Sequence, residues 1–144
     1  MAEKRFGKQT IKLSNPPSII STATIVGPIE GKGPLKDYFD QILEDDKWGQ
    51  ESWEKCETKL QEEAIRMALV NASLSEGSVD YLFAGDLLNQ IISSSYAARQ
   101  LSIPYFGLYG ACSTMTESLS LGSMAVDGGF ADNVVCVTSS HRTK

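Results

Sequence analysis

Residues 79–133 contain only six charged side chains in 55 positions, and this scarcity of charge is the strongest constraint on the fold. Apolar side chains are stabilised by burial. An uncharged stretch of this length is therefore rarely left on a protein surface. Residues 30–66 are the opposite, with 17 charged side chains in 37 positions, 11 of them acidic. The sequence therefore predicts a layered fold, with residues 79–133 mostly in its interior and residues 30–66 on its surface.

Turn residues and apolar periodicity divide the chain into alternating strands and helices. The predicted strands are residues 18–27, 79–85, 104–110 and 133–139, and the last of these is apolar enough to be a fully buried strand. The predicted helices are residues 35–42, 52–72, 94–101 and 111–127. This order implies right-handed crossovers, so we expect one α/β domain whose mostly parallel, mixed sheet is covered by helices on both faces.

Two of the predicted helices carry specific expectations. The helix at 52–72 begins after Ser52, a plausible N-cap, and its apolar stripe consists of Trp53, Cys56, Leu60, Ala64, Met67 and Ala68. The helix after Gly110 has small or apolar side chains nearly all round, with Glu117 as its only charge before Asp127. A helix without a polar face is buried on several sides.

Charge and cysteine content exclude several classes of protein. The net charge of −5 provides no general attraction for nucleic-acid phosphates. Three widely spaced cysteines argue against a disulfide framework and a structural zinc site, and favour a reducing, intracellular context. We find neither an apolar run long enough for a membrane span nor a signal-peptide core. Residues 1–12 are basic, and are expected to be either a solvated tail or a contact for an anionic surface.

Cys112 lies where the predicted strand 104–110 ends and the next helix begins. Backbone N–H groups and the positive end of the helix dipole stabilise a thiolate at such a position. Binding sites in parallel α/β sheets lie at the carboxyl ends of the strands. A lone cysteine is also commonly a small buried apolar residue, so both interpretations stay open for Cys112. For Cys56 and Cys136, which lie within an apolar stripe and an apolar strand, we favour a structural role.

Several motifs carry a resemblance to known families. The strand-to-helix cysteine in GACS at 110–113 resembles the thiolase fold of thiolases and β-ketoacyl synthases. More specifically, the chain is similar to the stage V sporulation protein AD family. The motifs that carry this similarity are GKQT at 7–10, GPLKDYFD at 33–40, AGDLLNQ at 84–90, AARQLSIPYFGLYGACST at 97–114 and VTSSH at 137–141.

The resemblance implies a thiolase-like fold made of two similar halves. Residues 1–144 would be the N-terminal half, with residues 1–15 as an extension, and the C-terminal half would lie outside this chain. Enzymes of this fold take a catalytic histidine, and a second cysteine or histidine, from their second half. Thiolase-fold proteins commonly dimerise through the strand before the cysteine, here residues 104–110, so we expect a homodimer.

The same resemblance implies a protein of sporulation and spore germination. It would bind dipicolinic acid (pyridine-2,6-dicarboxylate) without catalysis and would be needed for the uptake of this ligand into the developing spore. Its expected partners are the other stage V sporulation A membrane proteins. Its expected location is the cytoplasmic side of the spore inner membrane, as a peripheral protein.

The expected ligand-binding residues are Cys112, Ser113, Thr114, Asn89 and His141, grouped near the carboxyl ends of the strands. We predict no metal ligands and no cofactor, although Asp86 and Glu117 could hold a Ca²⁺ ion that bridges to the dicarboxylate, or could be structural caps. One alternative function is an acyltransferase of the thiolase or β-ketoacyl synthase type, with Cys112 as nucleophile. Another is a structural assembly subunit with a vestigial site.

Overall fold

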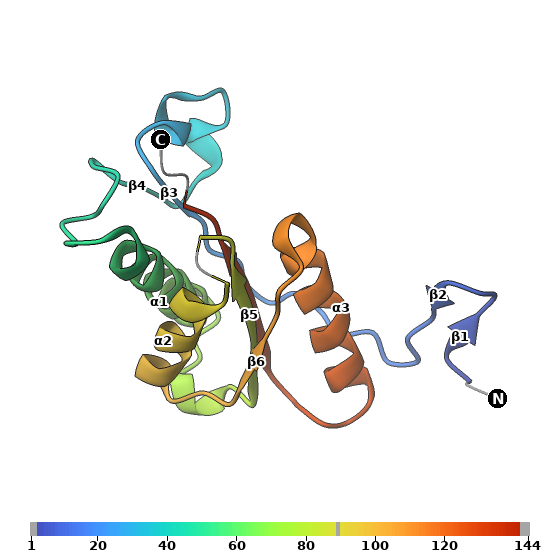
Figure 1. Cartoon of the computed structure of the whole chain (residues 1–144). Helices are drawn as coiled ribbons and strands as arrows, with labels where there is room; N and C mark the ends of the chain where they lie inside the picture. Colours follow the sequence, from blue (N-terminus) through green and yellow to red (C-terminus); the bar gives the residue numbers. More distant parts are fainter. Residues whose placement is uncertain (1–2, 89, 142–144) are drawn as a thin grey trace.

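The computed structural model describes residues 3–88 and 90–141. A three-stranded parallel sheet forms its centre, with two helices on one face and a third on the other (Figure 1). The strand order is β6-β5-β7, and the strands are β5 (Tyr81–Asp86), β6 (Tyr105–Gly107) and β7 (Val134–Ser139). The helices are α1 (Trp53–Asn71), α2 (Ile92–Leu101) and α3 (Thr114–Asp127). The predicted α/β class and the parallel sheet are confirmed.

The central strand β5 is the most deeply buried element. Phe83 on β5 pairs with Phe106 on β6 and with Cys136 on β7, so β5 has a parallel neighbour on each side. Helix α2 covers one face of this strand, with α1 beside it over β7, and α3 covers the other face. Burial on both faces explains why its sequence is a continuous apolar run rather than an alternating one. The largest apolar cluster lies between the sheet and α1 and α2, and includes Ile65, Leu69, Leu82, Leu101 and Val137.

Helix α1 begins as predicted but turns a different face to the core. The backbone N–H of Lys55 donates to the Ser52 hydroxyl at 3.3 Å, which confirms the N-cap. Of the predicted apolar stripe only Cys56 is buried. The buried side chains are Cys56, Glu57, Gln61, Ile65 and Leu69. The predicted stripe was wrong because two polar residues find hydrogen-bond partners inside the fold and are buried with them.

Segments 18–27 and 35–42 differ from their predictions. Only β3 (Ile25–Val26) is paired, in parallel, with β4 (Gln41–Ile42). The predicted helix at 35–42 is wrong: one 3₁₀ turn at Lys36–Tyr38 precedes β4. Asp40 accepts hydrogen bonds from the backbone N–H and the hydroxyl of Thr24, which holds the two segments side by side. A helix here would have no core to cover, since its predicted apolar side chains are largely exposed.

Strand β7 is an edge of the described sheet, and only Val137 on it is buried. The prediction of a fully buried strand is therefore wrong for the described part of the chain. The strand predicted at 104–110 is shorter, because the chain leaves the sheet after Gly107. No helix within residues 3–88 and 90–141 is long and apolar enough to cross a bilayer.

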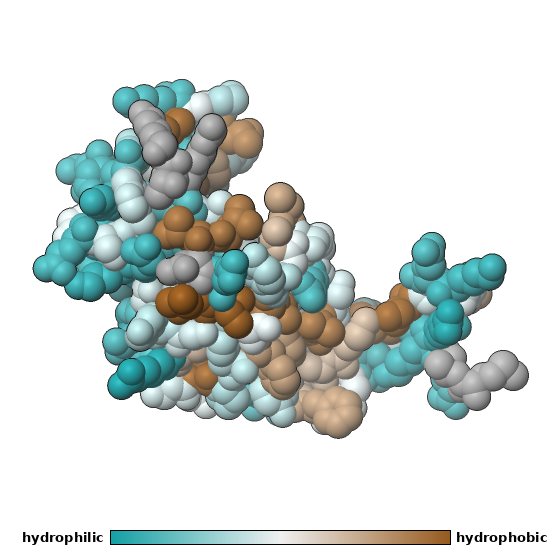
Figure 2. All heavy atoms as spheres, viewed as in Figure 1, coloured by the Kyte–Doolittle hydropathy of each residue, from teal (hydrophilic) through white to brown (hydrophobic). Residues whose placement is uncertain are grey.

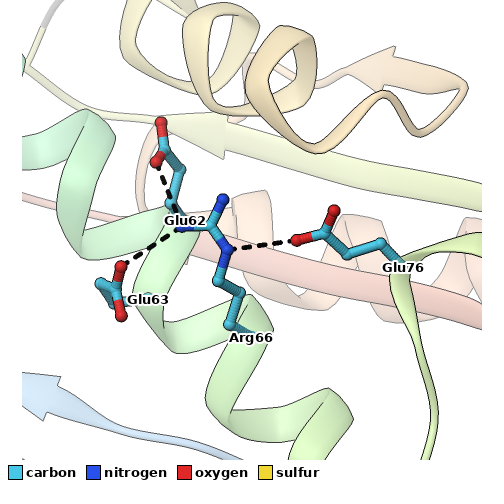
Figure 3. A network of polar contacts seen from close by, with 4 residues as sticks. All are labelled: Glu62, Glu63, Arg66 and Glu76. Atoms are coloured by element: carbon cyan, nitrogen blue, oxygen red, sulfur yellow. Dashed lines mark hydrogen bonds and ion pairs between the residues drawn. The ribbon is translucent and has the colours of Figure 1, made fainter.

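An ion-pair network holds α1 to the turn before β5 (Figure 3). Arg66 donates to Glu76 at 3.1 Å, and also contacts Glu62 and Glu63 one turn earlier on its own helix. The guanidinium is partly exposed, so the network contributes modestly to stability. Its effect is to fix the entry of the chain into β5.

The N-terminal segment is folded rather than a tail. Strands β1 (Arg5–Phe6) and β2 (Thr10–Ile11) form an antiparallel hairpin that stands away from the rest of the molecule (Figure 1). The extended chain that follows leads back along the molecule toward β3.

Candidate functional site

The turn between β6 and α3 places Cys112 at the carboxyl end of the sheet. After β6 the chain forms a 3₁₀ turn at Ala111–Ser113, and α3 begins at Thr114. Cys112 therefore lies one turn earlier than predicted, before the α-helix rather than within its first turn. Its side chain is exposed, as is that of Ser113. The structure thus brings a thiol and a hydroxyl together beside the N-terminus of a 14-residue helix.

Hydrogen bonds hold this turn in one shape. The Ser113 hydroxyl donates to the Gly110 carbonyl at 2.7 Å, and the Gly110 N–H donates to the Thr114 hydroxyl at 3.3 Å. Ala111 has a φ of 48°, a left-handed conformation that costs energy for a residue with a Cβ. Thr114 is buried, so it supports the turn from beneath while Cys112 and Ser113 face outward.

Two glycines allow the backbone to pass close to this turn. A Cβ on Gly85 would lie 2.2 Å from the Leu108 carbonyl oxygen and 2.7 Å from a methyl of Thr114. A Cβ on Gly110 would lie 2.5 Å from a carboxylate oxygen of Glu117. The Glu117 carboxylate therefore lies against the turn, and places a negative charge near Cys112.

Asp86 is at the end of β5 and caps helix α2. Its carboxylate accepts the Ser94 N–H at 3.0 Å and the Ser94 hydroxyl at 2.7 Å, and the side chain is buried. These contacts are those of a structural cap. Asn89, which the sequence predicts as an amide ligand, lies outside the described residues.

A buried polar cluster lies beneath the ends of β5 and β7, and the sequence did not predict it. Gln61 donates to the Gly85 carbonyl at 3.1 Å and to the Ser139 hydroxyl at 2.7 Å. Ser139 in turn donates to one carboxylate oxygen of Glu57 at 2.8 Å, and Ser93 donates to the other at 3.3 Å. The Glu57 carboxylate and the Gln61 amide nitrogen are thus buried with partners, and they tie α1 to both strand ends.

Burial raises the pKa of Glu57, because the charged form loses its hydration. The Ser139 hydroxyl opposes this effect by stabilising the carboxylate, and the charge of Asp86 reinforces it. The signal that could have identified the cluster is the four-residue spacing of Glu57, Gln61, Ile65 and Leu69, which places all four on one face of a helix.

His141 lies on the α1 side of the sheet. Its Nε2 is 2.7 Å from the Asp46 carbonyl oxygen, and its ring meets the edge of Trp53 with 4.5 Å between centroids. It follows β7, whereas Cys112 follows β6, and β5 lies between these strands. The ends of β6 and β7 are therefore two strand spacings apart, about 10 Å. Among the described residues no hydrogen bond joins His141 to Cys112.

The other two cysteines have sheltered thiols. Burial raises the pKa of Cys56 to about 11, and it also raises the pKa of Cys136, whose thiol donates to the Ser118 carbonyl. Cys112 is the exposed thiol of the three. Within the described ranges no group of three or more His, Cys, Asp or Glu side chains is arranged to hold a metal ion.

Comparisons with known proteins agree with this architecture. The chain matches the family model described as stage V sporulation protein AD over residues 7–144. Stage V sporulation protein AD of Bacillus subtilis (strain 168) is 43% identical over 138 residues, which are 96% of this chain and 41% of that protein. The chain therefore spans about two fifths of the length of this curated relative.

Two solved structures share the fold. The 3-oxoacyl-[acyl-carrier-protein] synthase III from Aquifex aeolicus VF5 has a TM-score of 0.56 and 22% identity, covering 64% of this chain and 31% of that chain. The priming β-ketosynthase from the R1128 polyketide biosynthetic pathway has a TM-score of 0.52 and 23% identity, covering 58% and 27%. At these identities the likeness concerns the fold, which is thiolase-like. By its match along residues 7–144, the chain belongs to the stage V sporulation protein AD family.

Proposed function

We propose that this protein binds dipicolinic acid without catalysis and is needed for its uptake into the developing spore. The observation that carries the proposal is the exposed turn of Cys112 and Ser113, held at the carboxyl end of the sheet in a chain of this sporulation family. The ligand itself comes from the family resemblance. The position of the turn at the carboxyl edge of the sheet, where α/β folds bind small molecules, supports the proposed location.

The chemistry of the ligand fits part of this turn. An aromatic dicarboxylate needs converging hydrogen-bond donors. The Ser113 hydroxyl would serve as one by turning from the Gly110 carbonyl, to which it donates in this structure, and the N-terminus of α3 lies beside it. Cys112 would form a wall of the site. Asn89 and His141 stay candidate ligands in this proposal, and Thr114 would act by supporting the turn.

Glu117 sets a condition on the binding of a dianion. Its carboxylate lies against Gly110 and would repel the ligand unless a cation lies between them. Ca²⁺ prefers carboxylate oxygens, and it can accept ligands from the protein and from dipicolinate at once. The binding assay therefore needs arms with and without Ca²⁺.

The proposal includes an assembly. We propose a homodimer that meets through the edge of β6, where Phe106 and Tyr109 are exposed. Other stage V sporulation A membrane proteins would be its partners, and its location would be the cytoplasmic side of the spore inner membrane, as a peripheral protein.

Titration calorimetry of the complete protein tests the binding function. Dipicolinate should release heat without forming a covalent adduct, and Ser113→Ala should weaken affinity roughly 10- to 150-fold, the effect of losing one charge-assisted hydrogen bond. Ser120→Ala, on the exposed face of α3 away from the turn, is the matched control. Absence of dipicolinate heat with and without Ca²⁺ would refute the proposal.

Acyl transfer is the second candidate, and the exposed Cys112 thiol favours it. A nucleophilic thiolate attacks a thioester carbonyl, expels the CoA thiolate and leaves an acyl-enzyme. Incubation with acyl-CoA would then give a mass increase on Cys112 that Cys112→Ala lacks. A structural assembly subunit, the third candidate, would give neither this adduct nor dipicolinate heat.

A further inference from the structure

The N-terminal hairpin is fixed in place by one buried carboxylate at the end of α3. The Lys4 ammonium donates to the Asp127 carboxylate and, at 3.0 Å, to the Asp127 carbonyl. The Asn15 N–H donates to the other carboxylate oxygen at 2.6 Å. A lysine at a helix C-terminus is further stabilised by the helix dipole. Both ends of the hairpin segment are thus tied to one point, so its direction relative to the sheet is defined.

The hairpin is basic in a molecule that is otherwise acidic. Asp127 neutralises Lys4, whereas Arg5, Lys8 and Lys12 are exposed, and in the described part of the chain none of the three forms an ion pair. Residues 1–12 carry a net charge of +3, so the rest of the chain carries −8 within the total of −5. The charge is therefore strongly polarised along the molecule.

The same hairpin exposes apolar side chains. Phe6 is 73% exposed and Ile11 is 51% exposed. In the strand register Arg5 faces Ile11 and Phe6 faces Thr10, so both faces of the hairpin combine an apolar residue with a polar one. Figure 2 shows this arm standing clear of the body with teal and brown side chains side by side. Isolated two-stranded hairpins are marginal in water, so a projecting hairpin with exposed apolar residues fits one that contacts another surface.

A groove of about 470 Å³ lies between the hairpin and the end of α3. Its lining includes the apolar side chains Ile11, Leu13 and Met124 and the cationic side chains Arg5 and Lys8. A lining that combines apolar and cationic side chains matches an amphipathic anion, with a negative headgroup and an apolar body.

We propose that residues 4–12, the basic hairpin, dock the protein on an anionic phospholipid bilayer. Basic side chains would contact the headgroups while Phe6 enters the interface, the combination that holds peripheral proteins on membranes. The acidic remainder of the molecule would be repelled by the same surface, so docking has one orientation. This inference deepens the peripheral location proposed above by naming the surface responsible.

Vesicle co-sedimentation of the complete protein tests this inference. We expect binding to phosphatidylcholine vesicles that contain about one third phosphatidylglycerol, decreasing with salt, and little binding to phosphatidylcholine alone. Each basic residue near an anionic surface changes the partition coefficient about fivefold. The variant R5Q/K8Q/K12Q should therefore bind roughly 100-fold more weakly.

The matched control is K32Q/K36Q/K55Q, which removes the same charge from exposed lysines outside the hairpin. It has the same net charge as the hairpin variant. It should nevertheless bind the anionic vesicles far better than the hairpin variant does. Equal loss in the two triple variants would overturn the inference, as would equal binding to both kinds of vesicle. Competition by soluble glycerol phosphate at low concentration would also overturn it, since it would indicate a site for a free phosphate.

A third variant separates the apolar contribution. Phe6→Ser should reduce the binding that persists at high salt, because apolar insertion is not screened by ions. Calorimetry of the hairpin variants with dipicolinate keeps the two proposals distinguishable. If a hairpin variant loses vesicle binding but keeps its dipicolinate heat, the result bears only on membrane docking. If the unmodified protein gives no dipicolinate heat, the result refutes only the proposed ligand binding.

Discussion

At Gly85 the backbone of β5 lies close to the chain that follows β6. Replacing it with alanine would place a methyl group 2.2 Å from the Leu108 carbonyl oxygen, which is backbone and cannot rotate away. We expect Gly85→Ala to lower the free energy of unfolding by about 1–3 kcal/mol through overpacking. Urea unfolding measures this effect.

The control is Gly77→Ala, where the nearest atom to the new methyl is 4.0 Å away. It should change the free energy of unfolding by less than about 0.5 kcal/mol. Equal stability of the two variants would contradict the close approach at Gly85.

Glu57 gives the stability of the fold a specific dependence on pH. Burial raises its pKa in the folded state, so the folded protein binds this proton more tightly than the unfolded chain. The free energy of unfolding should therefore fall as pH rises above the usual glutamate value of 4.5, until the carboxyl is ionised in both states. Glu57→Gln keeps a similar shape without the titration and should lack this fall.

Unfolding free energies of the wild type and Glu57→Gln across pH 4 to 8 measure the difference. The two should converge at the acid end and separate toward neutral pH, with the variant more stable there. Glu44→Gln, in an exposed loop, controls for removal of one negative charge. Parallel profiles for wild type and Glu57→Gln would show that the carboxyl is not desolvated.

At this scale the sequence predicts exposed and local features better than buried polar ones. The capping role of Ser52 and the strand-end position of Cys112 follow from neighbouring residues, so both could be foreseen. Glu57 and Gln61 could not be recognised as buried, because their partners Ser139 and Gly85 are far away in the sequence. Burial of a polar side chain depends on partners that only the fold brings together.

Strand β6 is an edge element with an aromatic surface. Phe106 is 49% exposed and stacks on Phe83 of β5, with 5.0 Å between ring centroids. If the homodimer forms along this edge, Phe106→Glu places a charge in the interface and should shift the complete protein from dimer to monomer. Light scattering measures the mass.

Phe130→Glu is the matched substitution, since Phe130 is also exposed but lies in the loop after α3. It should leave the dimer intact. A dimer that survives Phe106→Glu would place the interface elsewhere. So would a dimer that Phe106→Glu and Phe130→Glu disrupt to the same extent.

The predictability of an element depends on where its partners lie. Strand β5 was foreseen because its apolar content reflects burial against nearby elements. Helix α1 was foreseen in extent from its Ser52 N-cap, although its apolar periodicity indicated the wrong buried face. The segments at 18–27 and 35–42 were not, because a tertiary contact between Asp40 and Thr24 sets their conformation. The prediction that helix α3 is buried on several sides is wrong for the described part of the chain, because its outer side chains are partly exposed, namely Met115, Leu119, Leu121 and Met124.

At the scale of the whole molecule, charge and apolar surface are segregated. The acidic block at 30–66 and the basic hairpin lie at opposite ends (Figure 1), and apolar residues gather over β6 and α3 between them (Figure 2). Residues 79–133 form β5, β6, α2 and α3, but the prediction that this stretch is mostly interior is wrong for the described part of the chain, where Tyr96, Phe106 and Tyr109 are exposed. That residues 1–144 form the N-terminal half of a two-part fold stays a prediction.

The position of the dipicolinate site is tested most directly by the reactivity of the Cys112 thiol in the complete protein. Alkylation by iodoacetamide can be followed at each cysteine by mass spectrometry, and the sheltered Cys56 and Cys136 are internal controls. Saturating dipicolinate should slow alkylation of Cys112 at least about tenfold, as a ligand against this turn would cover the thiol. An unchanged rate at Cys112, under conditions in which calorimetry shows dipicolinate bound, would contradict a site at the turn between β6 and α3.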